Sequence, residues 1–189
     1  MKNLDALVFA LLLGVSVSLM GCGEKGSEVE GEGEELSGME SSEEKASPLR
    51  TEEGMIGDKE VKVQYGSPSV RDRVIWGELL PYDEVWRTGA NEATFVEFSD
   101  NVTVEGKALN AGKYSLFTIP KENADWTVIF NKEWDLEHGH YQYKEENDVL
   151  RVEVAPRWED NNQENLTISI EDPGLVIRWE KMSLPITIQ

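Results

Sequence analysis

The sequence of 189 residues contains one cysteine and only two histidines. A single cysteine excludes an intrachain disulfide, so an exported domain of this size must be held together by its hydrophobic core. Basic residues are also scarce, because 18 lysines and arginines stand against 37 acids, for a net charge of −19. This balance argues against nucleic acid as a partner, since binding to phosphates needs a basic face. It also argues against attraction to anionic lipid headgroups.

The sequence lacks an apolar run long enough to cross a membrane. Residues 6–20 form a run of 15 residues after Lys2, whereas a spanning helix needs about 20. A run of this length is typical of a secretory signal peptide. It leads through Gly21 to Cys22, the only cysteine. Residues 1–21 therefore resemble a bacterial lipoprotein signal, with Cys22 as the predicted lipidation site; the alternative is an ordinary signal peptide with an unrelated free cysteine.

Aromatic residues are missing from residues 22–57, which are rich in Glu, Gly and Ser. Such a segment buries too little apolar surface to offset its ordering entropy, so we expect a disordered acidic tether. Gly23 directly after the cysteine resembles the sorting signal of outer-membrane lipoproteins. The alternative is that the segment is a spacer without any sorting signal. The prediction is thus a signal peptide over 1–21, a tether over 22–57 and a folded domain over 58–189. The lipid is its expected membrane contact.

Helical periodicity is also absent, whereas short runs with strand character recur in the second part of the chain. Clear examples are residues 61–65, 94–98 and 126–130, separated by turn signals such as Asp172-Pro173-Gly174. About nine to ten short strands predict an all-β domain, either an antiparallel β-sandwich or a flattened barrel. The strand periodicity places three large aromatic residues in its core: Trp126, Phe130 and Trp179.

The densest polar chemistry lies in the long connection over residues 77–93. Arg87 offers five donors in a planar fork, and Asn91 offers both a donor and an acceptor. Nearby aromatic rings supply flat apolar faces, so the segment suits a sugar ring or a small carboxylate. The alternative is that Arg87 pairs with a buried acid and pins the loop across one end of the sandwich. The candidate binding residues are Trp76, Tyr82, Trp86, Arg87, Asn91 and Glu92.

Other chemical motifs are weak. His138 and His140 are flanked by acids, but zinc usually takes three or four ligands and the chain has no third histidine. Exposed loop histidines are the simpler interpretation, so no metal and no cofactor are predicted. A nucleophile elbow and a phosphate-binding glycine loop are both missing.

Several ordered motifs resemble those of a bacterial protein family of unknown function, the one numbered 2911, over about residues 60–189. The resemblance implies an exported protein, often a lipoprotein, and carries no activity. The chain departs from the family pattern around residues 134–143, which lowers the weight of its two histidines as site residues. The motifs that carry the resemblance are residues 75–77, 80–82, 85–94, 111–120, 126–132 and 148–152.

Two functions follow from these observations. The first is a non-catalytic binding or interaction module at the cell envelope, which contacts a glycan, a peptide or another envelope protein through residues 86–92. The second is an envelope hydrolase of a glycan or ester, in which Glu92 is the general acid or base and Arg87 stabilises negative charge. A catalytic Glu92 should lie in an open cleft beside a second acid. A structural Glu92 should be buried against Arg87.

Overall fold

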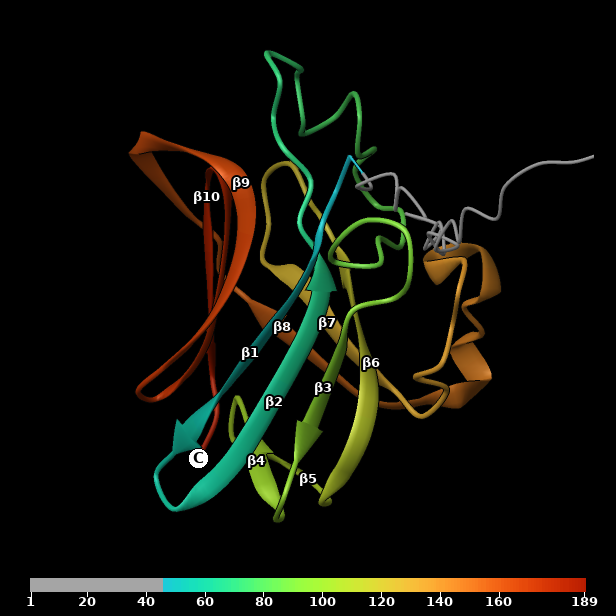
Figure 1. Cartoon of the computed structure of the whole chain (residues 1–189), viewed down its shortest axis with the longest axis vertical. Coiled ribbons are helices and arrows are strands. Elements are labelled where there is room, and N and C mark those ends of the chain that lie inside the picture. The colour runs from blue at the N-terminus through green and yellow to red at the C-terminus, as the bar shows by residue number, and fades with distance from the viewer. Residues whose placement is uncertain (1–45) are drawn as a thin grey trace, which may run out of the picture. The chain divides into compact units, whose positions relative to one another are not determined.

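The computed structural model describes residues 46–189, so the predictions for the signal peptide, for Cys22 and for most of the tether lie outside the described residues. Within this range the chain is almost entirely β-structure (Figure 1). The elements are β1 (Leu49–Ile56), β2 (Lys59–Gly66), β3 (Phe95–Phe98), β4 (Val102–Val104), β5 (Lys107–Leu109), β6 (Gly112–Ile119), β7 (Trp126–Asn131), the 3-10 helices η1 (Gly139–Gln142) and η2 (Glu145–Asn147), β8 (Asp148–Val154), β9 (Arg157–Glu171) and β10 (Gly174–Thr187).

The strands form two facing sheets and a small hairpin. The larger sheet is antiparallel, with the order β1-β2-β3-β6-β7-β8. The long hairpin of β9 and β10 forms the second sheet, and Figure 1 shows it standing opposite the first. β4 and β5 pair with each other at one end. This arrangement confirms the predicted antiparallel β-sandwich, and the described strands do not close into a barrel.

The core lies between the sheets because side chains along each strand alternate between a buried inner face and a more exposed outer face. On β2, Val61 and Val63 are at most 2% exposed, while Lys62 between them is half-buried. β10 places Ile177 and Trp179 on its inner face in the same way. β7 is buried along its whole length, as expected for a strand covered on both faces. The predicted core positions of Trp126, Phe130 and Trp179 are confirmed, since all are at most 1% exposed.

Strand β1 corrects the predicted extent of the disordered tether. It falls inside residues 22–57, yet it pairs with β2 from Leu49 opposite Gly66 to Ile56 opposite Lys59. Most of its side chains are exposed and only Ile56 is buried. Backbone hydrogen bonds to β2 therefore hold most of this strand, with Ile56 as its one buried side chain, and composition carries no signal for such pairing. The folded domain begins before residue 58.

Strand β10 corrects a second expectation. The runs 175–179 and 184–188 predict two strands, whereas one strand continues through both, with irregular pairing around Glu180. In residues 46–189 no helix is long and apolar enough to cross a membrane.

Candidate functional site

The connection between β2 and β3, residues 67–94, folds over the end of the larger sheet at which β2 ends (Figure 1). The backbone N–H of Trp86 donates to the carbonyl of Thr118 at 2.7 Å, and the N–H of Thr118 donates back at 2.9 Å. Ala90 donates to the carbonyl of Gly66 at 3.2 Å. These bonds attach the loop to β6 and to the end of β2, so it is a fixed part of the sandwich rather than a loose excursion.

Five non-glycine residues of the loop adopt left-handed backbone conformations, and two of them lie at the pocket end of the loop. Thr88 has a φ of 54° and Asn91 a φ of 64°. A β-branched residue rarely adopts this conformation, and it persists only where the surroundings determine it. Thr88 is fully buried, and its carbonyl accepts a hydrogen bond of 2.9 Å from the hydroxyl of Thr94. The loop is therefore held in one conformation, which is the property a binding platform needs.

Trp86 lies between the loop and the core. Its side chain is 4% exposed, its indole N–H donates to the carbonyl of Gly89 at 3.0 Å, and its ring stacks on Trp179 at 5.8 Å. Trp76 meets both rings edge-on at 6.0 Å and also packs on Trp126 at 4.8 Å. Trp76, predicted as a binding residue, thus stands at the centre of a tryptophan cluster. It contributes to packing and does not line the cavities described below.

A pocket of about 560 Å³ opens beside this cluster. A second hollow of about 650 Å³ adjoins it, and Arg87, Asn91 and Tyr141 line both. We call the first the Arg87 pocket and the second the Glu92 hollow, because Glu92 and Glu137 line the latter. The residues of the Arg87 pocket that bear on its chemistry are Arg73, Glu84, Trp86, Arg87, Asn91, His140, Tyr141 and Trp179.

Arg87 is half-buried where the two cavities meet. Its aliphatic stem packs on Gly139 so closely that a Cβ there would lie 2.5 Å from Arg87 Cδ. Its guanidinium lies 5.6 Å from the centre of the Tyr141 ring, and Nη1 donates to the carbonyl of Asn91. Burial lowers the pKa of Arg87, and electrostatic interactions with Tyr141 and Glu92 offset this lowering in part. The site therefore holds a partly desolvated cation, for which an anion is a favourable neighbour.

Residues 134–143, which we call the wall segment, supply the opposite side of the pocket. Its two histidines were interpreted as exposed loop residues, but its 3-10 helix η1 brings His140 and Tyr141 into the lining. The expected exposed histidine is found only at His138, because His140 is half-buried. Its ring lies 4.2 Å from that of Tyr141, and its Nδ1 has no hydrogen-bond partner within residues 46–189. The described residues contain no group of three or more metal-ligating side chains.

Contacts at both ends fix the wall segment. At one end, the Lys113 ammonium lies 3.7 Å from the centre of the Trp134 ring, a close cation–π contact. At the other end, Tyr143 donates to Asp148 at 2.7 Å, and Arg151 donates to the Tyr143 hydroxyl at 2.6 Å. Burial and the Asp148 carboxylate raise the pKa of Tyr143 to about 12, so this phenol stays protonated and keeps its hydrogen bond. The pocket thus has two positioned sides.

The histidine in the wall predicts a pH dependence of stability. Burial, and then the positive charge of Arg87, lower the pKa of His140 below 6.5. The unfolded chain therefore takes up this proton first as the pH falls, and the folded state loses stability below about pH 6.5. We expect His140→Gln to lose less stability between pH 7.5 and 5.5 than the unchanged protein. The control His138→Gln should lose as much stability as the unchanged protein. Urea midpoints measure this; identical losses in all three proteins would contradict the assignment.

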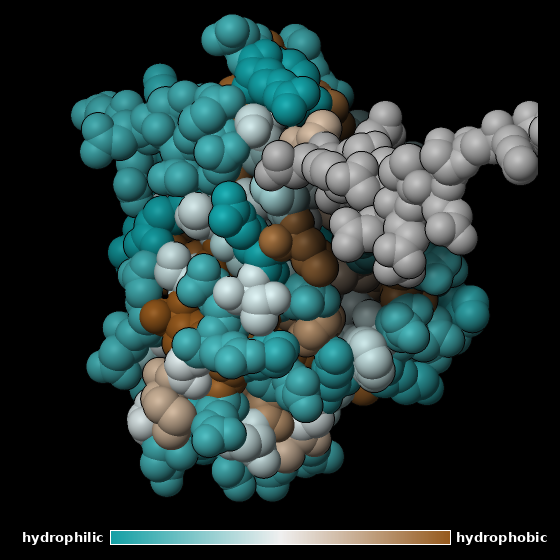
Figure 2. All heavy atoms as spheres, viewed as in Figure 1, coloured by the Kyte–Doolittle hydropathy of each residue, from teal (hydrophilic) through white to brown (hydrophobic). Residues whose placement is uncertain are grey.

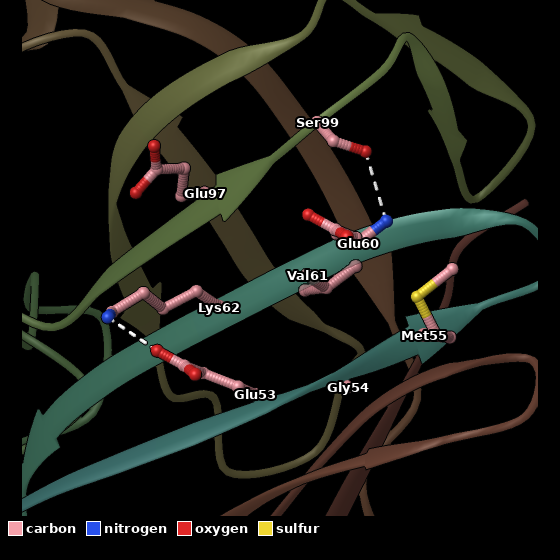
Figure 3. A pocket seen from close by; sticks show the side chains of 8 residues that line it. All are labelled: Glu53, Gly54, Met55, Glu60, Val61, Lys62, Glu97 and Ser99. Carbon is pink, nitrogen blue, oxygen red and sulfur yellow. Dashed lines mark hydrogen bonds and ion pairs between the residues drawn. The ribbon is translucent and has the colours of Figure 1, made fainter.

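A further hollow, of about 540 Å³, lies on the outer face of β1 and β2. Figure 3 shows two contacts here: Lys62 pairs with Glu53 at 2.5 Å, and the Ser99 hydroxyl accepts from the Glu60 backbone at 3.0 Å, while the Glu97 side chain points away from both. Because its acids are exposed and Lys62 is already paired, the hollow shows no convergent ligand-binding chemistry. The face in Figure 2 is mostly hydrophilic, with apolar residues in small separate spots.

The structure brings only part of the predicted site together. Trp86, Arg87 and Asn91 line the Arg87 pocket, and Glu92 lies in the adjoining hollow. Tyr82 is half-buried and packs against Gly77, outside both cavities. Five of the eight pocket residues that bear on its chemistry were not among the predicted binding residues: Arg73, Glu84, His140, Tyr141 and Trp179. The last three lie outside the loop, far along the chain from Arg87.

The fold and the pocket together define an all-β sandwich domain with a fixed loop and a preformed cavity at one end. The chain belongs to the family described as proteins of unknown function, DUF2911, whose model matches residues 47–188. This confirms the family resemblance seen in the motifs. The match begins at residue 47, which agrees with the inclusion of β1 in the domain. Neither a curated protein nor a solved structure matches the chain.

Proposed function

We propose that this protein is a lipoprotein of the bacterial cell envelope, anchored in the outer membrane, whose sandwich binds a ligand in the Arg87 pocket without catalysing a reaction. The observation that carries the proposal is the pocket itself. Its volume of about 560 Å³ falls in the range of small-molecule sites. A half-buried cation and several aromatic residues line it, and hydrogen bonds to the strands hold its loop.

A small ligand, or one end of a glycan or peptide, suits this site better than a broad protein surface. The face in Figure 2 carries no large apolar patch of the kind that protein partners usually cover. The pocket instead combines aromatic faces with directional donors, and this pairing gives affinity and orientation to a compact ligand.

The binding role predicts ligand-dependent stabilisation that requires Arg87. We expect at least one member of a panel of glycans, peptides and small acids to raise the melting temperature by roughly 5–10 °C at a hundred times its dissociation constant. Arg87→Met should abolish the shift. Arg157→Met, an exposed arginine outside the pocket, should leave it unchanged. A shift that survives Arg87→Met, or a panel without any binder, would contradict the proposal.

One observation supports the hydrolase as a second candidate. Glu92 and Glu137 line the same hollow beside Arg87, so two carboxyl groups and a cation lie near one another. Turnover of generic esters or glycosides, lost in Glu92→Gln with the fold intact, would favour this function over simple binding.

The proposed lipid anchor predicts that its removal changes the cell fraction in which the protein is found, without changing the fold. Cys22→Ser removes the thiol that would carry the lipid, so the variant should move from the detergent-extracted membrane fraction to the soluble envelope fraction. Fractionation followed by immunoblotting measures this, with the unchanged protein as control. Continued membrane retention of Cys22→Ser would refute the lipoprotein assignment.

A further inference from the structure

The Arg87 pocket has a charge that contrasts with the rest of the domain. Residues 60–189 contain 24 acids and 13 bases, a net charge of −11. The described residues that line the pocket include two arginines, Arg73 and Arg87, but only one carboxylate, Glu84. Arg73 donates to two backbone carbonyls, of Val70 at 3.0 Å and of Ser69 at 2.6 Å. Arg73 is exposed and uses two of its five donors in these bonds, whereas Arg87 is half-buried and uses one donor, so Arg87 has the greater capacity for a ligand.

The polar groups of the pocket that lack partners need hydrogen-bond acceptors. Within residues 46–189, the guanidinium of Arg87 has one hydrogen bond, to the carbonyl of Asn91. Trp179 lines the pocket and is 1% exposed, and its indole N–H has no acceptor in the described chain. Buried donors are normally satisfied, so an unpaired indole N–H in a residue of the lining favours a guest that carries an acceptor. His140 Nδ1 is also buried without a partner in the described residues, as is the indole nitrogen of Trp76, which does not line the pocket.

Two other side-chain donors at this site are already paired within the protein. The indole of Trp86 donates to Gly89, and the Asn91 amide donates to the carbonyl of Ser47 at 3.3 Å. A carboxylate, sulfate or phosphate accepts hydrogen bonds and donates none when ionised. Such an oxyanion supplies what Arg87 and Trp179 lack, and it compensates for the desolvation of the guanidinium. A neutral sugar hydroxyl meets these needs only in part.

We propose that the ligand of the Arg87 pocket carries an oxyanion on a flat ring, with the oxyanion on the Arg87 guanidinium and the ring against the aromatic residues Trp86, Trp179 and Tyr141. This inference rests on the proposed binding function and specifies its ligand class. A carboxylate fits best, because its two oxygens match the guanidinium fork. An aromatic acid presents this combination directly, and a uronic acid presents it through the C–H face of its pyranose chair.

The test compares acids with neutral molecules of the same shape. The Cys22→Ser chain is titrated calorimetrically, at constant ionic strength, with benzoate, benzamide, glucuronate, glucose and phenyl phosphate. We expect at least one carboxylate to bind about tenfold or more tightly than its neutral counterpart. Arg87→Lys should lose about tenfold, Arg87→Met should lose binding, and Arg157→Met should match the parent. If phenyl phosphate binds more tightly than both carboxylates, the oxyanion of the ligand is a phosphate and the preference for a carboxylate is wrong.

Two outcomes overturn the inference and separate it from the proposed function. If a neutral glycan or peptide from the broader panel binds in an Arg87-dependent manner and none of the acids does, the binding function stands and the oxyanion is wrong. If neither the acids nor the broader panel bind, both fail. Equal affinity for an acid and its neutral counterpart also overturns the oxyanion, because charge then contributes nothing.

Discussion

Replacing Gly66 with alanine is expected to destabilise the domain by about 3 kcal/mol, the upper end of the usual cost of overpacking. Gly66 ends β2, and the loop lies directly on it. A Cβ at this position would be 2.1 Å from the carbonyl oxygen of Ala90 and 2.9 Å from its carbon. Both partners are backbone, so relief requires moving the loop, and with it the hydrogen bond from Ala90 to Gly66. Ligand binding should be lost with the loop position.

Gly57→Ala is the matched control for this prediction. Gly57 lies in the turn between β1 and β2, where a Cβ would meet nothing within 4 Å, but its φ of 61° disfavours a side chain. Its cost should therefore be about 1–2 kcal/mol from the backbone alone. Urea unfolding measures the free energy of unfolding of both variants, and the comparison is valid if their m-values are equal. If Gly66→Ala costs no more than Gly57→Ala, the close contact between the loop and β2 is not as described.

Replacing Trp76 with alanine is expected to lower the free energy of unfolding by about 3–5 kcal/mol, as for other large aromatic truncations in a core. Its ring packs edge-on against four other tryptophans: Trp86, Trp126, Trp158 and Trp179. Removing it leaves a cavity that these rigid neighbours fill poorly.

Trp158→Ala serves as the control for Trp76, because Trp158 is 51% exposed and its one ring contact within residues 46–189 is with Trp76. Trp158→Ala should lower the free energy of unfolding by about 1 kcal/mol or less, in addition to the loss from its partly buried surface. Denaturant midpoints again decide. If Trp76→Ala has normal stability but no longer binds the ligand, Trp76 is a binding residue. That result would contradict its assignment to the packing of the tryptophan cluster.

The strands that alternate apolar and polar residues could be predicted from sequence, whereas β1 could not. Residues 61–65 reveal β2 because one face must be buried and the other wet. β1 carries the exposed acids Glu52 and Glu53 before Gly54 and is held by its register with β2. Pairing partners are set by the whole sheet, so an edge strand without a buried face resembles a linker in composition.

The site was predictable only where its residues are neighbours in sequence. Arg87 and Asn91 stand out because they lie four residues apart in one long connection. Trp179 and His140 reach the same pocket from β10 and from the wall segment, and no local pattern links such distant positions. Trp76 was assigned to the site because an aromatic residue in a loop looks the same whether it packs inward or faces a ligand.

The most direct test of the Arg87 pocket is the movement of the indole N–H resonances in a nitrogen–proton correlation spectrum. The chain has six tryptophans, and their environments differ: Trp179 lines the pocket, whereas Trp134 and Trp158 are 39% and 51% exposed elsewhere. On titration with the tightest acid of the panel, we expect the Trp179 signal to shift strongly downfield, because its N–H gains an acceptor. The signals of Trp134 and Trp158 should stay in place. Shifts confined to Trp134 or Trp158 would place the ligand on the exposed aromatic surface and contradict the Arg87 pocket.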